Sequence, residues 1–207
     1  MTDSSSTALA ATRERLLDAA AQLFYSDGVG VGVEALCRAA GVSKRSMYQL
    51  FDSKDEVMAA SLERMAPVYW AALAPPDEEQ RSPRARILHV FERQEELATS
   101  PDYRGCPFVA AAVEVKRPDH PASLAARKHK DALTGFFQQE AERAAVAQPE
   151  RLAQQLTMVF DGASARAVVQ ASALQGLSVA TASALLDQAG VVDQADVNQT
   201  GVAEPAV

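Results

Sequence analysis

Two short helical segments joined by a tight turn constrain this chain more than any other feature. Apolar residues recur at helical spacing over Val33–Ala40, and a second segment, Lys44–Phe51, follows after a turn that begins at Gly41. Glycine allows the chain to reverse tightly, and Ser43 can cap the helix that follows. The spacing predicts a helix-turn-helix over about residues 32–51.

The rest of the chain also shows helical periodicity, and none of it alternates like a strand. A hydrophobic fraction of 48% with 6% aromatic residues favours closely packed helices, so the predicted fold class is all-α. Pro67 predicts a kink or a join near Ala66. Further helices are predicted at residues 12–27, 54–74, 84–99, 105–116, 122–146, 150–172 and 176–190.

The second segment of the motif carries side chains that suit the major groove of DNA. Four basic residues lie between Cys37 and Lys54 against one acidic residue, Asp52, although the net charge of the 207-residue chain is −7. This indicates a local phosphate-binding surface, and a solvated charged helix without a partner is the alternative. Arg45 and Gln49 are long enough to reach base edges. The helix is expected to expose Lys44, Arg45, Ser46, Tyr48 and Gln49 and to turn Met47, Leu50 and Phe51 inward.

The residues that surround the motif resemble a known family. The stretch Thr12–Ala20, the pair Leu23–Phe24, Gly28 and the run Ala39–Val57 are similar to the DNA-binding domain of the TetR family of transcriptional regulators. The resemblance covers about residues 10–70. It implies a three-helix DNA-binding domain and a homodimer that binds double-stranded operator DNA.

The same resemblance assigns roles to single side chains. It implies that Ser43, Tyr48 and Lys54 bind DNA phosphates, and that Lys44, Arg45, Ser46 and Gln49 face the groove. One position departs from the family, because Gly32 stands where a serine or threonine usually caps the second helix. Glycine supplies no hydroxyl, so one phosphate contact is expected to be missing or to come from a backbone amide.

The second half of the chain, residues 71–190, is expected to bind an effector and to dimerise. The segments Tyr103–Phe108, Asp119–Pro121 and Asp161–Ala163 resemble the regulatory domain of one TetR subgroup. The resemblance implies a pocket for a small apolar or amphipathic effector. The aromatic residues expected to line it are Trp70, Phe91, Phe108, Phe136 and Phe137.

An apolar stripe on the segment 150–172 has two interpretations. It consists of Leu152, Leu156, Val159, Phe160 and Ala163. It indicates either a four-helix dimer interface, which the resemblance favours, or a core within one chain. The polar segment 75–83 is the expected linker between the two halves, and residues 191–207 are expected to form a disordered tail.

Enzymatic and metal chemistry find little support. Cys106-Pro107-Phe108 is reminiscent of thiol-transfer enzymes, but those need a βαβ sheet, and a redox-sensing Cys106 in a regulator is the milder alternative. The histidines, at positions 89, 120 and 129, lie on different predicted segments. No catalytic residue, metal site or cofactor is therefore predicted. The two cysteines and the lack of a secretory signal or membrane span predict a cytoplasmic protein without a membrane partner.

These observations predict a DNA-binding repressor that a small molecule releases from its operator. A helix-turn-helix module without an effector is the alternative, favoured if the core of the second half is filled. The same fold can also activate transcription.

Overall fold

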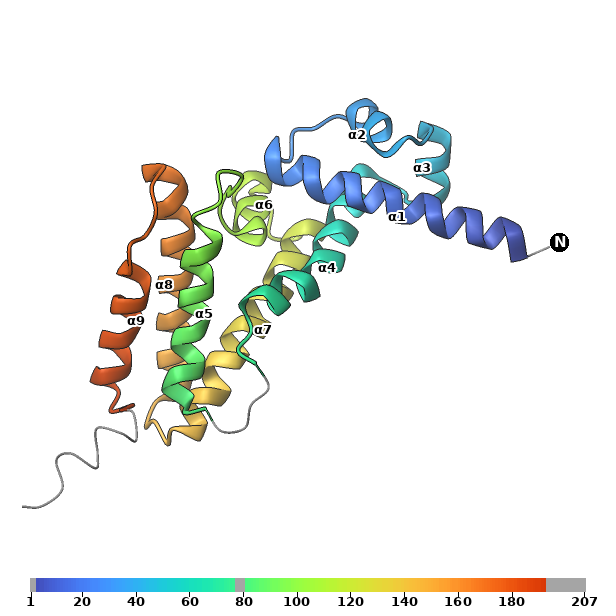
Figure 1. Cartoon of the computed structure of the whole chain (residues 1–207). Coiled ribbons are helices and arrows are strands. Elements are labelled where there is room, and N and C mark those ends of the chain that lie inside the picture. Colours follow the sequence, from blue (N-terminus) through green and yellow to red (C-terminus); the bar gives the residue numbers. More distant parts are fainter. Residues whose placement is uncertain (1–2, 77–80, 193–207) are drawn as a thin grey trace, which may run out of the picture. The chain divides into compact units, whose positions relative to one another are not determined.

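The chain is helical throughout the part that the computed structural model describes, residues 3–76 and 81–192 (Figure 1). The predicted all-α class is confirmed, and every predicted helix except the first lies within a few residues of its expected limits. In the described ranges the helices are α1 (Asp3–Ser26), α2 (Val33–Ala40), α3 (Lys44–Leu50), α4 (Lys54–Leu73), α5 (Pro83–Leu97), α6 (Pro107–Val115), α7 (Pro121–Arg143), α8 (Pro149–Gln170) and α9 (Leu177–Gln188).

Prolines open four consecutive helices, α5 to α8. Pro83, Pro107, Pro121 and Pro149 are each the first residue of their helix. Proline suits this position because its fixed φ matches the helix and its missing N–H would have no partner there. The helices therefore begin at the prolines themselves.

Two helices differ from expectation in ways that have a local cause. Helix α1 begins at Asp3 instead of Thr12, and the four residues directly before Thr12, Ala8–Ala11, are strong helix formers. The Thr12 hydroxyl donates to the carbonyl of Ala8 at 2.8 Å within that extension. Helix α4 continues through Pro67 as one helix, so the predicted join is not observed.

The chain forms two compact units, and each mixes distant parts of the sequence. The first contains the residues up to Ala71 together with Asp102–Asp131, and the second contains Ala72–Pro101 and the residues from Ala132 onward. Helix α6 and the first half of α7 thus belong with the helix-turn-helix. The predicted functional division near residue 71 stays a prediction, because compactness does not report function.

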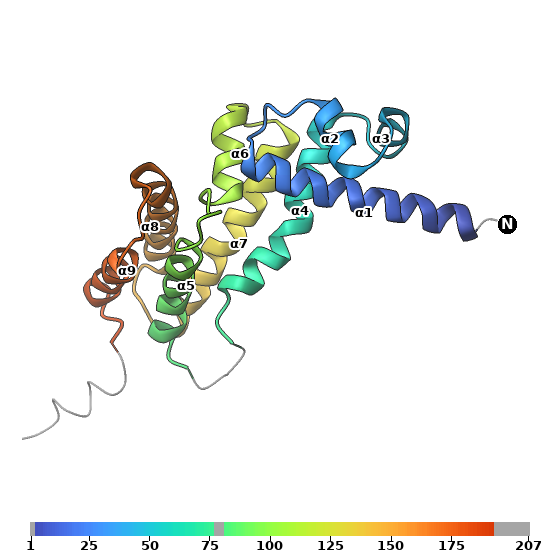
Figure 2. The same ribbon diagram turned by 45° about the horizontal axis from the view of Figure 1, so that its top comes forward.

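The first unit is built on two apolar clusters. In one, Leu16 and Leu17 of α1 pack with Leu36 of α2 and Met47 of α3. In the other, Met58 of α4 packs against Phe108 of α6 and three alanines of α7, Ala122, Ala125 and Ala126. Both ribbon views show α2 and α3 beside each other next to α1 (Figures 1 and 2). The packing fixes the direction in which α3 presents its outer face.

The second unit joins α5, α8, α9 and the second half of α7. The rings of Phe91 and Phe137 stack at 5.6 Å between centroids, and Phe160 meets Phe91 edge-on at 6.2 Å. The buried side chain of Gln94 donates to the carbonyl of Phe160 and to Ser164 Oγ at 2.6 and 2.8 Å. A polar link at the centre of an apolar contact fixes the register of α5 on α8.

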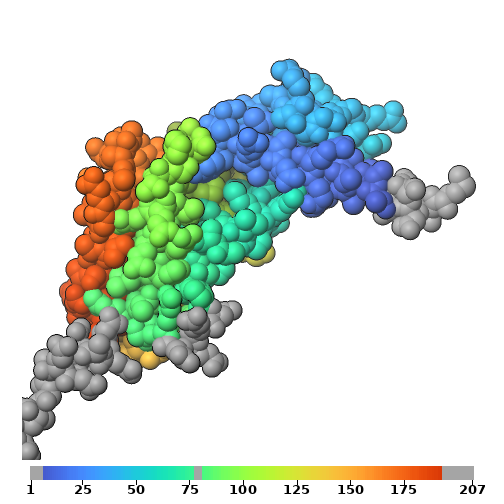
Figure 3. Space-filling model, viewed as in Figure 1, coloured from blue at the N-terminus to red at the C-terminus, as the bar shows by residue number. Residues whose placement is uncertain are grey.

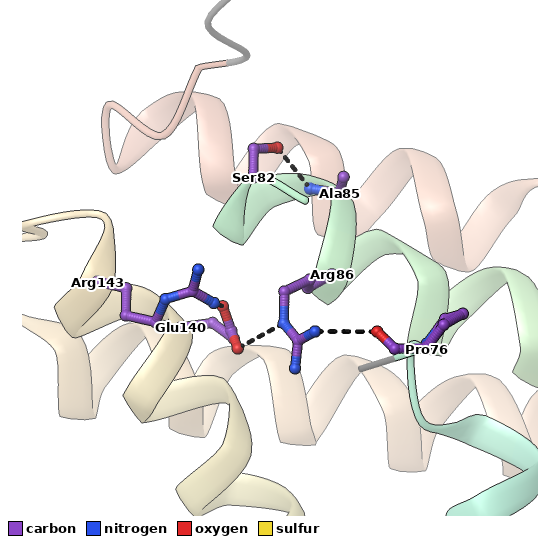
Figure 4. Close-up of polar contacts among 6 residues, drawn as sticks. All are labelled: Pro76, Ser82, Ala85, Arg86, Glu140 and Arg143. Carbon is purple, nitrogen blue, oxygen red and sulfur yellow. Dashed lines mark hydrogen bonds and ion pairs between the residues drawn. The ribbon is translucent and has the colours of Figure 1, made fainter. Parts of the chain in front are cut away.

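An arginine pair and a buried carboxylate fasten the start of α5 to the end of α7 (Figure 4). Arg86 Nε donates to Glu140 Oε1 at 2.8 Å, and Arg143 donates to the other oxygen at 2.5 Å. The Glu140 side chain is 5% exposed, and both of its carboxylate oxygens are paired with an arginine. Arg86 also donates to the carbonyl of Pro76 at 3.2 Å, and Ser82 caps α5 by accepting from the amide of Ala85.

The chain ends fall partly outside the described residues. Residues 77–80 of the expected linker and residues 193–207 of the expected tail lie outside them. Val191, at the start of that tail, is 4% exposed, and its carbonyl accepts from Arg84 at 2.7 Å. The packed chain therefore extends at least to Val191.

Candidate DNA-binding site

The turn between α2 and α3 has the geometry that the sequence predicts. Gly41 has a φ of +63°, and the amides of Gly41 and Val42 donate to the carbonyls of Arg38 and Cys37. These two hydrogen bonds cap the C-terminus of α2, and the positive φ that they require favours glycine at position 41. Ser43 then caps α3, because its Oγ accepts from the amide of Ser46 at 3.0 Å.

Helix α3 divides its residues into an inner and an outer face as expected. Met47 is completely buried, Phe51 is 8% exposed just after the helix, and Leu50 packs against the same cluster. On the outer face Tyr48 is 52% exposed, although its ring is large and apolar. Lys44, Arg45 and Gln49 are also exposed, and Ser46 is half-buried with its hydroxyl 2.8 Å from that of Ser43.

The outer face of α3 lies at the surface of its unit. Figure 3 shows side chains of the segment coloured for α2 and α3 at the surface beside those of α1. The exposed side chains include donors of the kinds that bind phosphate oxygens and base edges. The predicted contacts of Ser43, Lys44, Arg45, Ser46, Tyr48 and Gln49 are compatible with this placement and remain predictions.

One acidic residue that the sequence analysis did not single out lies on this surface. Glu34, in the first turn of α2, forms an ion pair with Lys44 at the start of α3. The hydrogen bond from Lys44 lowers the pKa of Glu34, and the same bond raises the pKa of Lys44. The ammonium group of Lys44 is therefore already paired with an anion, the carboxylate of Glu34. The pair joins two helices across the turn, which no periodicity within one helix reveals.

Lys54 has structural partners in addition to its predicted phosphate. Its Nζ donates to the carbonyl of Val29 at 2.9 Å and to that of Val31 at 3.1 Å. Both carbonyls belong to the connection between α1 and α2, in which the amide of Val31 donates to the carbonyl of Gly28 at 3.5 Å. Lys54 thus stabilises that connection from the first turn of α4. Its phosphate contact remains a prediction.

Helix α6 holds the same connection from the other side. Glu114 accepts a hydrogen bond from the amide of Val29 at 2.9 Å. Gly28, with a φ of +82°, leaves room for that carboxylate, because a Cβ there would lie 2.7 Å from Glu114 Oε2. At the other end of α6, the Tyr25 hydroxyl donates to the carbonyl of Gly105 and accepts from the amide of Arg104. Helix α6 and the residues just before it are therefore joined to α1 and to the α1–α2 connection.

The aromatic residues predicted to line one pocket lie in both compact units. Phe91 and Phe137 are fully buried against each other in the second unit, and Phe136 beside them is half-buried. Phe108 and the half-buried Trp70 belong to the first unit. Phe91 and Phe137 fill core space in this structure, so their role in a pocket stays a prediction.

Phe108 is buried in a cluster that also contains a histidine. Its ring stacks on that of His129 with 3.7 Å between centroids, and Tyr69 meets both rings edge-on. Burial, with a smaller contribution from the charge of Lys130, lowers the pKa of His129 to about 4. Burial likewise raises the pKa of the Tyr69 hydroxyl far above its ordinary value. Both side chains are therefore neutral at physiological pH and serve as packing surface.

The cysteines and histidines form no chemical centre in the described part of the chain. Cys106 is 2% exposed at the N-cap of α6, and Cys37 is also buried as a free thiol. His120 instead links two helices, because its Nε2 lies 3.0 Å from Asp55 Oδ2 of α4. Within residues 3–76 and 81–192 no three metal-ligating side chains gather, and no described helix is long and apolar enough to cross a membrane.

The apolar stripe of α8 faces the interior of its own unit. Leu152, Leu156, Phe160 and Ala163 are each less than 9% exposed. The interpretation of this stripe as a dimer interface is therefore wrong, because these side chains are buried by packing within one chain. The opposite face of α8 is exposed and carries Met158, Gly162, Ala165 and Val169.

Comparisons with known proteins agree with this geometry. The family model described as "Bacterial regulatory proteins, tetR family" matches residues 16–60. A crystal structure from Streptomyces avermitilis, assigned as a TetR transcriptional regulator, is 56% identical. The match covers 86% of this chain and 98% of that one, with a TM-score of 0.84.

More distant structures share the fold. Reduced Escherichia coli NemR is 25% identical over 86% of this chain and 95% of its own, with a TM-score of 0.71. A TetR-family regulator from Streptomyces coelicolor is 22% identical, covers 87% and 96% of the two chains, and has a TM-score of 0.75. The curated proteins contain no match.

Proposed function

Because this chain belongs to the TetR family of transcriptional regulators, which bind DNA, we propose that it is a cytoplasmic homodimeric repressor released from its operator by a small molecule. The observation that carries the proposal is the exposed outer face of α3, held by the Ser43 cap and by buried Met47. In this proposal Arg45 and Gln49 contact bases, and Ser43 and Tyr48 contact phosphates. Ser46 faces the groove beside them.

The ion pair with Glu34 gives Lys44 a conditional role in this proposal. A phosphate competes with the Glu34 carboxylate for the same ammonium group. Lys44 therefore exchanges one anion for another when DNA binds, and gains less affinity than an unpaired lysine would.

A homodimer is proposed on the exposed face of α8 and its neighbour α9. On α8 the face consists of Met158, Gly162, Ala165 and Val169, and on α9 it contains Ala180 and Ala184. Met158 is 69% exposed and Val169 is 77% exposed. Small residues allow helices to approach closely, and large apolar residues gain from being covered. A second copy of the chain would cover them and set two α3 helices about 34–36 Å apart for a two-fold symmetric operator.

A module that binds DNA without an effector is the second candidate. The observation that favours it is the packing of Phe91, Phe137 and Phe160, which fill the centre of the second unit with their rings. Under this candidate the predicted aromatic pocket does not open, and DNA affinity does not respond to small molecules.

Selection of genomic fragments by the purified protein tests the proposed function. We expect enrichment of an inverted repeat, and reduced transcription in vitro from a promoter that carries it. A library of small molecules then separates the two candidates, because an effector lowers the affinity for the selected repeat. Increased transcription would overturn repression, and the absence of any enriched sequence would overturn operator binding.

A further inference from the structure

A hollow between α6 and the first half of α7 has the size of a small-molecule site. It has a volume of about 440 Å³, is open to solvent along one side and lies entirely within the first compact unit. Small-molecule sites have volumes of about 300–1,000 Å³. We call this hollow the α6–α7 groove. It is separate from the cluster of Phe91 and Phe137, which lies in the second unit.

One wall of the α6–α7 groove is apolar. Phe108, Val109, Ala112 and Val113 of α6 line it, and Val113 is 63% exposed although it is a valine. The Phe108 ring is fixed from behind by its stack on His129. The wall is therefore a firm apolar surface that an apolar ligand body can cover with little rearrangement.

The remaining sides of the α6–α7 groove carry positive charge. Lys116 and Arg117 follow α6, and Arg127 and Lys130 lie one turn apart on α7. The lining contains no aspartate or glutamate, whereas the whole chain has a net charge of −7. Arg127 donates to the carbonyl of Pro118 at 3.3 Å, which holds its guanidinium near the α6–α7 connection. Such a concentration of cations beside an apolar wall attracts an anion with an apolar body.

A buried hydroxyl lies in the lining. Ser123 of α7 is 7% exposed, and its Oγ has no hydrogen-bond partner among the described residues. Buried polar atoms are nearly always paired, so an unpaired one is a common mark of a site that a ligand or a water completes. A ligand acceptor close to α7 could take this hydrogen bond after a rotation of the serine side chain.

We propose that the α6–α7 groove binds a free anionic amphiphile, with its apolar body on Val109, Ala112 and Val113 and its acid group among Lys116, Arg127 and Lys130. A nucleic acid fits less well, because the aromatic ring of the groove is buried and offers no exposed face for a base to stack on. The idea that this ligand is the effector rests on the proposed function; the binding itself does not.

The contacts of α6 supply a route from the α6–α7 groove to the DNA-binding surface. Glu114, on the same helix as the apolar wall, accepts from the amide of Val29 before α2. A ligand that shifts α6 changes this contact and hence the support of the α1–α2 connection. The shift can favour or oppose DNA binding according to which arrangement the ligand binds more tightly.

Three probes with the same ten-carbon chain test the site: decanoate, decanol and decyltrimethylammonium, each below its micelle concentration. Calorimetry on the DNA-free protein should show one decanoate per protomer. Decanol should bind at least tenfold more weakly, and the ammonium should not bind. Equal binding of decanoate and decanol would overturn the proposal, and so would the absence of decanoate binding.

Two variants tie the binding to the α6–α7 groove. Arg127→Gln should weaken decanoate at least fivefold, while Lys128→Gln, which removes the same charge from an exposed neighbour outside the lining, should change it less than twofold. Val113→Asp places a carboxylate on an exposed part of the wall, so it should weaken decanoate without unfolding α6. If Arg127→Gln and Lys128→Gln behave alike, the groove is not the site.

Two further outcomes distinguish failure of the groove proposal from failure of the proposed regulator function. If Arg127→Gln weakens binding of a random DNA duplex, in the absence of decanoate, as much as it weakens decanoate binding, the α6–α7 groove is a nucleic-acid surface and the amphiphile proposal fails. Because decanoate binding is measured without DNA, its failure leaves operator binding intact. A protein that binds decanoate in the α6–α7 groove but selects no operator would keep the site and lose the proposed regulator.

Discussion

At the scale of single residues, α3 and the first turn of α4 carry cations that differ in their other contacts. Arg45 is exposed on the outer face, Lys44 is paired with Glu34, and Lys54 holds the carbonyls of Val29 and Val31. Charge counting along the sequence treats the three as equal. Their contributions to DNA binding and to stability are expected to differ, because only two of them have partners to lose.

Arg45→Ala and Lys54→Ala should separate base recognition from support of the fold. Arg45→Ala should relax sequence preference at one operator position and leave stability unchanged within about 0.5 kcal/mol. Lys54→Ala should weaken binding to all sequences and lower the free energy of unfolding by about 1–3 kcal/mol, because two charge-assisted hydrogen bonds are lost. Anisotropy on an operator and on a scrambled duplex, together with urea unfolding, measures both effects. Similar behaviour of the two variants would refute the assignment.

Removal of the Glu34 carboxylate should strengthen DNA binding. In Glu34→Gln the Lys44 ammonium no longer has an anionic partner and can pair with a phosphate, so the slope of log K against log salt should steepen by about one. Glu150→Gln, at the equivalent first turn of α8, is the matched control and should have no effect. A Glu34→Gln protein with unchanged or weaker affinity would show that Lys44 does not contact DNA.

At the scale of elements, apolar periodicity together with glycine, proline and capping residues was enough to predict the helices. It was not enough to predict what each helix face packs against. The turn at Gly41 and the Ser43 cap are local, and the structure confirms both. The packing partner of the apolar stripe from Leu152 to Ala163 could not be predicted, because an apolar face indicates that it is buried but not which helix or chain buries it. The Glu34–Lys44 pair and the Glu114–Val29 bond cross between helices, so no pattern within one helix could predict them.

A carboxylate from α5, that of Glu95, caps the N-terminus of α9. Glu95 accepts from the Ser178 hydroxyl at 2.7 Å and from the amides of Gly176, Ser178 and Val179. Burial alone would raise the pKa of Glu95, but these hydrogen bonds outweigh it and hold the pKa below its ordinary value of 4.5. The charged carboxylate therefore stabilises the folded state, in part by compensating the amides at the helix N-terminus.

Glu95→Gln should destabilise the protein in a pH-dependent manner. The expected loss near neutral pH is about 1–2 kcal/mol, because the amide binds the same donors without charge. A lowered folded pKa gives stability that is fully present above 4.5 and is lost as the pH falls from there through the folded pKa. The difference between wild type and variant in urea unfolding should therefore shrink below pH 4.5. With Glu92→Gln as the control, a difference that persists unchanged in acid would contradict the role of the charge.

At the scale of the whole molecule, the proposed function depends on a second copy of the chain. The exposed face of α8 contains Met158 and Val169 beside Gly162, where an added Cβ would meet nothing within 4 Å. Sequence analysis predicted the dimer from the family resemblance and favoured for it a stripe of α8 that is buried within one chain, so the exposed face is the one proposed. The sequence alone could not distinguish the two faces of α8, because both carry apolar residues.

Met158→Glu should break the homodimer while leaving each chain folded. The side chain is 69% exposed in one chain, so a glutamate costs little there, whereas in a dimer interface it would bury an unpaired charge. Sedimentation equilibrium should show a monomer with unchanged helix content and with operator affinity reduced at least a hundredfold. Leu124→Glu, at an exposed leucine of α7, should stay dimeric. A dimeric Met158→Glu protein would place the interface elsewhere.

The central claim, sequence-specific binding of two protomers through α3, is tested most directly by anisotropy on the selected operator and its scrambled counterpart across a salt series. The claim predicts two protomers per duplex and a preference of at least about a thousandfold for the operator at physiological salt. It also predicts that Arg45→Ala reduces that preference. Equal affinity for the two duplexes at every salt concentration would contradict it.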